Sequence, residues 1–149
     1  FWLDMVIDVP GWADTAAGIS MVAFFAFLII EMIRGVLKQE RVSKDTIFQA
    51  VSAYLLLGVT WMGLYALVYR ADPAAIHFPG GLLVDDWKPL LYFSYTTLTT
   101  LGYGDITPVS PMARSLAMVE STVGPLYLAV LLARLVSLYS REKRVDVED

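Results

Sequence analysis

The most distinctive chemistry of the chain lies in ten residues, Thr96 to Asp105, which read TTLTTLGYGD. They combine four threonines, two glycines, a tyrosine and an aspartate, and they lie between two long apolar segments. A polar stretch can exist at membrane depth only if its backbone groups have partners, and cations are one such partner for carbonyl oxygens. Gly102 and Gly104 can adopt backbone angles that other residues avoid. Alternating angles would turn successive carbonyls toward a common axis, where they could coordinate a cation.

The composition of the whole chain places this stretch in a membrane protein. The 149 residues are 57% hydrophobic and 17% charged, with a mean hydropathy of +0.59, which is too apolar for a soluble domain of this length. The absence of cysteine excludes disulfides and thiol catalysis. The single histidine, His77, has no second residue for metal or triad chemistry, and no stretch resembles a basic nucleic-acid surface. An enzyme is therefore the least expected class, and we expect neither a cofactor nor a nucleic-acid partner.

Three apolar segments are long enough to cross a membrane as helices. The second, residues 46–69, carries no charge, and its helix would be about 36 Å long against a hydrocarbon core of about 30 Å. Residues 88–99 predict a helix too short to span, which would descend from one side and end at the polar stretch. The carbonyl end of that helix would favour a cation there.

Local signals mark the ends of these helices. Ser43 or Asp45 could cap the second segment. Asp85 and Asp86 suit the start of the short helix, with Pro89 in its first turn. Aromatic residues gather toward the outer end of the second segment, as they do at a membrane interface: Trp61, Tyr65 and Tyr69.

Basic residues are unevenly distributed between the two sides of the predicted membrane. Eight of them lie at the link between the first two segments or toward the C-terminus, and three lie on the other side. The positive-inside rule places the link and the C-terminus in the cytoplasm, and the polar stretch then faces outward. Phe1 would lie outside, so a parent protein with a cytoplasmic N-terminus would have four spans. The eight are Arg34, Lys38, Arg41, Lys44, Arg134, Arg141, Lys143 and Arg144, and the three are Arg70, Lys88 and Arg114.

These segments predict an all-α protein of a cell membrane, with three transmembrane helices and one re-entrant helix. In order, we expect an extracellular loop or the end of a truncated helix (1–14), a first transmembrane helix (15–38), an outer helix (46–69), a re-entrant helix (88–99), the coordinating stretch (100–105), an inner helix (111–140) and a cytoplasmic tail (141–149).

The stretch TTLTTLGYGD resembles the selectivity filter of tetrameric potassium channels, and the similarity covers the pore unit from about Thr46 to Ser140. The compact architecture is similar to prokaryotic channels, with an added N-terminal helix. The resemblance implies a homotetramer that conducts K⁺ passively, with K⁺ as the permeant ion. One residue departs from the family: Leu101 stands where valine is usual. The implied ion-binding residues are Thr100, Leu101, Gly102, Tyr103 and Gly104, with the Thr100 hydroxyl included.

The resemblance also indicates how the filter would be supported. Asp105 would lie at the outer mouth, but the re-entrant helix lacks the tryptophan or glutamate that often binds this aspartate. Tyr92 could supply a hydroxyl instead, and Thr96 stands in the same region. Glu120 lies inside the third span, where a carboxylate needs a partner or a function. It either braces the filter from behind or bonds a threonine or serine of a neighbouring helix.

The third span carries two further signals. Gly124 falls where relatives carry a hinge glycine, and Pro125 would kink the helix, so these two residues are candidates for a gating hinge. Below them an apolar face at helical spacing is a candidate for the inner pore lining, although ordinary packing would give the same spacing. That face comprises Leu128, Leu132 and Val136.

Other functions stay open at this point. A weakly selective cation channel is one, and a non-conducting membrane scaffold is another. An ion-transporter subunit would need several filter-like repeats, and the chain has one. Voltage sensing is not supported, because no helix carries arginine at every third position.

Overall fold

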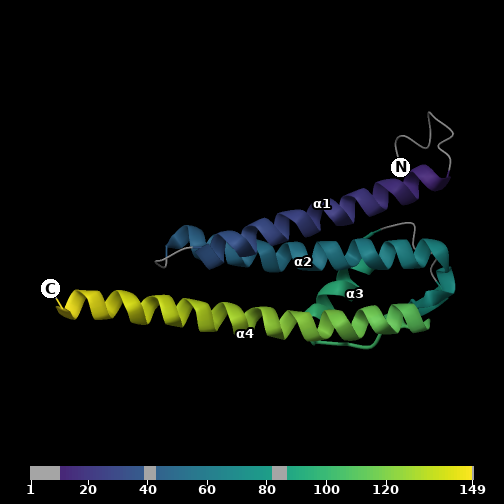
Figure 1. Cartoon of the computed structure of the whole chain (residues 1–149). Coiled ribbons are helices and arrows are strands. Elements are labelled where there is room, and N and C mark those ends of the chain that lie inside the picture. The colour runs from purple at the N-terminus through teal and green to yellow at the C-terminus, as the bar shows by residue number, and fades with distance from the viewer. Residues whose placement is uncertain (1–10, 39–42, 82–86, 149) are drawn as a thin grey trace.

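The protein is a bundle of long helices that enclose a short one. The computed structural model describes residues 11–38, 43–81 and 87–148. Within these ranges α1, α2 and α4 are long, and Figure 1 shows the short helix α3 crossing between α2 and α4. Three helical stretches are long and apolar enough to cross a membrane, Thr15–Val36, Lys44–Ala71 and Pro111–Ser137. These features confirm an all-α membrane fold. The helices are α1 (Gly11–Lys38), α2 (Lys44–Ala71), α3 (Lys88–Leu98) and α4 (Pro111–Glu148).

The start of α2 carries the predicted cap. The Ser43 hydroxyl accepts a hydrogen bond from the Thr46 backbone N–H at 3.1 Å, and the Thr46 hydroxyl accepts one from the Ser43 N–H at 3.2 Å. This reciprocal pair satisfies two backbone donors that the helix itself leaves unpaired. At α3, the predicted caps Asp85 and Asp86 lie outside the described residues, while Pro89 occupies the first turn as predicted.

Three helices extend beyond their predicted limits. Helix α2 exceeds the predicted 46–69 by two residues at each end. Helix α1 begins at Gly11, so the last residues of the predicted loop 1–14 are helical, and residues 1–10 lie outside the described ranges. Helix α4 continues through Pro125 to Glu148, so it includes most of the predicted tail 141–149. The tail sequence is rich in arginine, lysine and glutamate, which are good helix formers.

A small sheet closes the end of the bundle where α2 ends and α4 begins. Two short helical turns, η1 (Pro73–Ala75) and η2 (Pro79–Gly81), flank the strand β1 (Ile76–His77). It pairs antiparallel with β2 (Thr107–Pro108), with Ile76 opposite Pro108. The Ala75 carbonyl also accepts hydrogen bonds from the N–H groups of Val109 and Ser110, at 2.8 and 3.1 Å. These contacts hold the segment that follows Asp105 against the loop that follows α2.

The main core lies where α2, α3, the start of α4 and the loop after α2 meet. Tyr65 of α2 is fully buried there, and its ring centroid is 4.7 Å from that of Phe93 on α3. The prediction that Tyr65 belongs to an aromatic belt at the membrane interface was therefore wrong. Its side chain points to the interior because its hydroxyl has a buried partner on α4.

Candidate functional site

The backbone of the polar stretch alternates in handedness. Thr100, Gly102 and Gly104 have φ angles of 59°, 54° and 81°, whereas Leu101 and Tyr103 between them do not have positive φ. In an ordinary extended strand successive carbonyls point to opposite sides. Changing the handedness at every second residue turns them toward the same side, so the alternation gives a row of carbonyl oxygens with a common direction.

Local hydrogen bonds hold this conformation. The Gly102 N–H donates to the Thr96 carbonyl at 3.0 Å, and the Thr100 N–H donates to the Thr97 carbonyl at 2.9 Å. Glycine takes a positive φ without steric cost, but at Thr100 the same conformation costs roughly 1–2 kcal/mol. Thr100 is the one non-glycine residue with positive φ in the described ranges. Its hydroxyl donates to the Thr99 carbonyl at 2.6 Å, which leaves its lone pairs available to a cation.

Helix α3 directs its carbonyl end at the same place. It ends at Leu98, two residues before Thr100. Near the end of α3, the hydroxyls of three threonines donate hydrogen bonds to backbone carbonyls of the preceding turn. These hydroxyl protons therefore have their acceptors within the helix. The partial negative charge of a helix C-terminus therefore lies beside the row of carbonyl oxygens. Those three are Thr96 and Thr97, both to Phe93, and Thr99, to Tyr95.

A tyrosine holds the C-terminal end of the stretch. The Tyr92 hydroxyl donates to the Asp105 carboxylate at 2.9 Å, and the rings of Tyr92 and Tyr103 lie parallel with centroids 6.4 Å apart. The hydrogen bond is the one that the sequence suggested. Loss of surrounding water, followed by the hydrogen bond to Asp105 and its charge, raises the pKa of the Tyr92 phenol. The hydroxyl therefore stays protonated and keeps its role as donor.

Glu120 links three helices from inside the bundle. Its side chain is fully buried, and it accepts hydrogen bonds from the Tyr65 hydroxyl of α2 at 2.5 Å and from the Ser94 hydroxyl of α3 at 2.6 Å. Bonds to a carboxylate are roughly twice as strong as those between neutral groups. The sequence left the partner of Glu120 open, and Ser94 is the serine of a neighbouring helix that one alternative required.

Ser94 also connects α3 directly to α2. Its hydroxyl lies 2.9 Å from the Gly58 carbonyl, so a single proton is shared between that carbonyl and Glu120. Beside it, the Tyr95 hydroxyl donates to the Leu55 carbonyl at 2.7 Å. A Cβ atom at Gly58 would lie 2.5 Å from the Tyr95 ring, so the absence of a side chain at Gly58 lets the ring pack against α2.

Gly124 is the point where α4 touches the end of α3. A Cβ atom there would lie 1.9 Å from the Leu98 carbonyl oxygen, a distance that no side chain tolerates. Because α4 is continuous through Gly124 and Pro125, close contact with α3 is sufficient to explain the glycine. A hinge at these two residues stays a prediction.

The predicted inner lining faces away from the other helices of the chain. Leu128, Leu132 and Val136 are 48%, 64% and 56% exposed. The opposite side of α4 carries Glu120 and Tyr127, whose hydroxyl donates to the Ala50 carbonyl of α2 at 2.7 Å. These exposed side chains lie on a face of α4 that can meet a pore or another subunit.

Sequence reasoning missed several residues that hold the site. Tyr65 and Ser94 carry hydroxyls in apolar helices, and Gly58 interrupts such a helix. Each type is a weak signal alone, because serine, tyrosine and glycine occur in many membrane helices. A carboxylate inside a membrane helix indicates that hydrogen-bond donors must lie nearby, but the sequence does not show which hydroxyl contacts it.

Comparisons with known proteins identify relatives of the chain. A family model described as "Ion channel" matches residues 67–141, which is half of the chain. The chain is 32% identical to the inward rectifier potassium channel Kirbac3.1 of Paramagnetospirillum magnetotacticum, over 58% of this chain and 33% of that protein. It is also 32% identical to two-pore potassium channel 5 of Arabidopsis thaliana, over 67% of this chain and 23% of that protein.

A shorter relative is covered more fully. The chain is 30% identical to Protein LctB of Bacillus caldotenax, over 64% of this chain and 74% of that protein. Of the two potassium channels, by contrast, the chain spans a third or less of the length. No solved structure gives a significant match.

Proposed function

Because the chain belongs to the ion channel family, we propose that it conducts K⁺ passively across a membrane through a filter of backbone carbonyls. The observation that carries the proposal is the alternation of positive φ at Thr100, Gly102 and Gly104. The relatives named as potassium channels support K⁺ as the permeant ion. Carbonyl oxygens replace the water around the ion, and adjacent sites let one ion displace the next.

A complete filter requires more than one chain. A single row of carbonyls cannot surround an ion, so four copies are arranged about a common axis. Leu101 and Tyr103 support this assembly, because they are 54% and 68% exposed in the single chain. In a ring of four these side chains turn away from the axis and pack against neighbours, and the carbonyls of residues 100–104 line the pore.

The supports behind the filter fix its width. Tyr92 restrains Asp105 at the mouth, the Thr96 carbonyl holds the Gly102 N–H, and Glu120 locks α3 to α2 and α4. Asp105 also attracts cations by its charge.

Gating is assigned to the inner half of α4. Gly124 and Pro125 supply a bend, and the apolar ring below them closes the pore by losing its water. That ring consists of Leu128, Leu132 and Val136, which are exposed on one face of the helix.

The charge distribution sets the orientation. With the basic link and the C-terminal end of α4 in the cytoplasm, the filter opens to the outside of a cell membrane. A weakly selective cation channel is the second candidate, because Leu101 departs from the usual valine at a position that lines the filter.

Ion flux from liposomes tests the proposal. Purified protein in vesicles loaded with K⁺ should release the ion rapidly, whereas vesicles loaded with Na⁺ should not, and the particle should have the mass of four subunits. Gly102→Ala should strongly reduce the flux, because alanine strains the filter backbone at a φ of 54°. Within the chain no atom lies within 4 Å of the new methyl group, so the loss would come from backbone strain and not from a clash. Gly80→Ala is the matched control, since Gly80 also has positive φ and open space but lies in the outer loop. Equal flux of both ions, or full flux from Gly102→Ala, would refute the proposal.

A further inference from the structure

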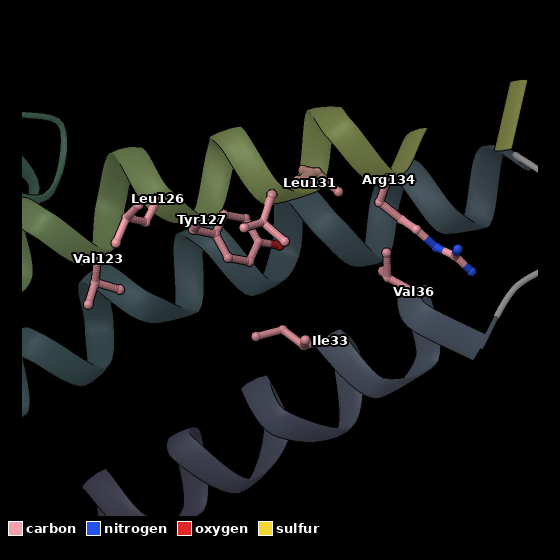
Figure 2. A pocket seen from close by; sticks show the side chains of 8 residues that line it. Ile33, Val36, Val123, Leu126, Tyr127, Leu131 and Arg134 are labelled. Atoms are coloured by element: carbon pink, nitrogen blue, oxygen red, sulfur yellow. The ribbon is translucent and has the colours of Figure 1, made fainter. Parts of the chain in front are cut away.

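An open groove runs between α1 and α4. Both helices pack against α2, and between them they leave a cavity of about 280 Å³. Figure 2 shows Ile33 and Val36 of α1 facing side chains of α4 across it. Along α4 the lining extends from Val123 to Arg134. None of these residues belongs to the filter or its supports.

The wall of the groove is apolar. On α4, Leu126 and Val130 are 57% and 62% exposed. The other α4 residues that line the groove before Arg134 are Val123, Tyr127 and Leu131. The Tyr127 hydroxyl is engaged with the Ala50 carbonyl, so it does not offer a polar group to the groove. The apolar wall offers water no hydrogen-bond partners. A molecule that binds in the groove must therefore be apolar along most of its length.

One end of the groove is positively charged. Arg134 closes the lining, and Figure 2 shows its guanidinium extending past Val36 at that end. Lys38, the last residue of α1, is exposed at the same end of the bundle. Arg134 already has a contact within the chain, but a guanidinium carries five donors in a planar fork, so it can bind the oxygens of a phosphate in addition. Basic pockets between membrane helices at the cytoplasmic side bind anionic headgroups for this reason.

The dimensions fit a hydrocarbon chain. From Val123 to Arg134 the groove is about 16 Å long at 1.5 Å per residue, close to one leaflet of a hydrocarbon core of about 30 Å. A groove of this length with apolar walls and one basic end suits a single acyl chain with its headgroup at the basic end.

We propose that this groove binds one acyl chain of an anionic phospholipid, with the lipid phosphate held by Arg134. The chain extends toward Val123, and the lipid belongs to the leaflet at the basic end of the bundle. That this leaflet is the cytoplasmic one rests on the orientation proposed above, whereas the site itself does not depend on ion conduction.

Native mass spectrometry of the detergent-solubilised protein tests the charge of the site. Phosphatidylglycerol should be retained about fivefold more tightly than phosphatidylcholine with the same chains, which matches the contribution of one arginine near an anionic group. Arg134→Gln should abolish this preference. Arg34→Gln is the matched control, because it removes the same charge from α1 outside the groove and should leave the preference unchanged. Equal retention of both lipids, or a preference that survives in Arg134→Gln, would overturn the proposal.

Two further measurements test the position of the chain. Val130→Trp fills the groove and should lose the bound lipid, whereas Ile30→Trp, at an exposed α1 residue outside the lining, should retain it. In the unaltered protein, phosphatidylglycerol with a photoreactive acyl terminus should label the segment around Val123 and Leu126. Labelling elsewhere, or a crosslink between two subunits through this groove, would show that something other than a lipid chain occupies it. The unaltered protein makes this second test independent of how the variants fold.

Discussion

The buried cluster around Glu120 makes a quantitative prediction. Glu120→Ala leaves the Tyr65 hydroxyl without an acceptor in a fully buried position, which costs about 1–3 kcal/mol. Ser94 loses less, because its hydroxyl can turn fully to the Gly58 carbonyl 2.9 Å away. The space left by the carboxylate adds on the order of 1 kcal/mol. We therefore expect Glu120→Ala to lower the free energy of unfolding by about 2–4 kcal/mol.

Glu120→Gln should cost far less, on the order of 1 kcal/mol or below. The amide oxygen can accept from Tyr65, the amide N–H can donate to the Ser94 oxygen, and the Ser94 proton can go to the Gly58 carbonyl. The Tyr65 hydroxyl, the Ser94 hydroxyl and the Gly58 carbonyl then all keep a partner. Free energies can be measured by titrating the reconstituted protein with sodium dodecyl sulfate in mixed micelles.

A double mutant isolates the stranded hydroxyl. Adding Tyr65→Phe to Glu120→Ala removes the group that has lost its acceptor, so it should recover about 1–3 kcal/mol. In the unaltered protein the same Tyr65→Phe change should be destabilising. If Glu120→Gln is as harmful as Glu120→Ala, or if Tyr65→Phe brings no recovery, the cluster is not held by these hydrogen bonds and the reasoning fails.

Two other substitutions test contacts on either side of the filter. Gly124→Ala should cost about 1–3 kcal/mol or more, because its Cβ would lie 1.9 Å from the Leu98 backbone oxygen and force the helices apart. Gly18→Ala is its control, since there the nearest atom is the flexible end of a leucine side chain, and equal losses for the two would contradict the close contact. Tyr92→Phe removes the donor to Asp105 and should accelerate slow inactivation in current recordings, and unchanged kinetics would argue against a restraint at the mouth. Since the Tyr92 pKa is raised, this restraint should persist from neutral pH to above the usual phenol pKa, and its loss at mildly alkaline pH would contradict the assignment.

The spans and the polar stretch were predictable because they depend on local sequence. A charge-free run such as 46–69 predicts a membrane helix by length alone, and Gly102 and Gly104 permit the positive φ that the structure has. The bond from Tyr92 to Asp105 was within reach for a similar reason, since the residues lie only 13 positions apart.

The network behind the filter was not predictable in the same way. Tyr65 and Glu120 are separated by 55 positions, and their contact depends on how α2 and α4 dock. An outer position on its helix made Tyr65 look like an interface residue, because sequence spacing does not show which face of the helix is covered. For Gly124, the contact with Leu98 arises only once α3 has entered between the long helices.

The reversal potential between K⁺ and Na⁺ tests the central claim most directly. Purified protein is placed in a planar bilayer with K⁺ on one side and Na⁺ at the same concentration on the other. The current should reverse more than about 59 mV from zero, at a voltage that makes the K⁺ side negative and so opposes the flow of K⁺ down its gradient. That displacement corresponds to a K⁺ permeability more than about tenfold that of Na⁺. A current that reverses near zero would show that the carbonyl row from Thr100 to Gly104 does not select K⁺.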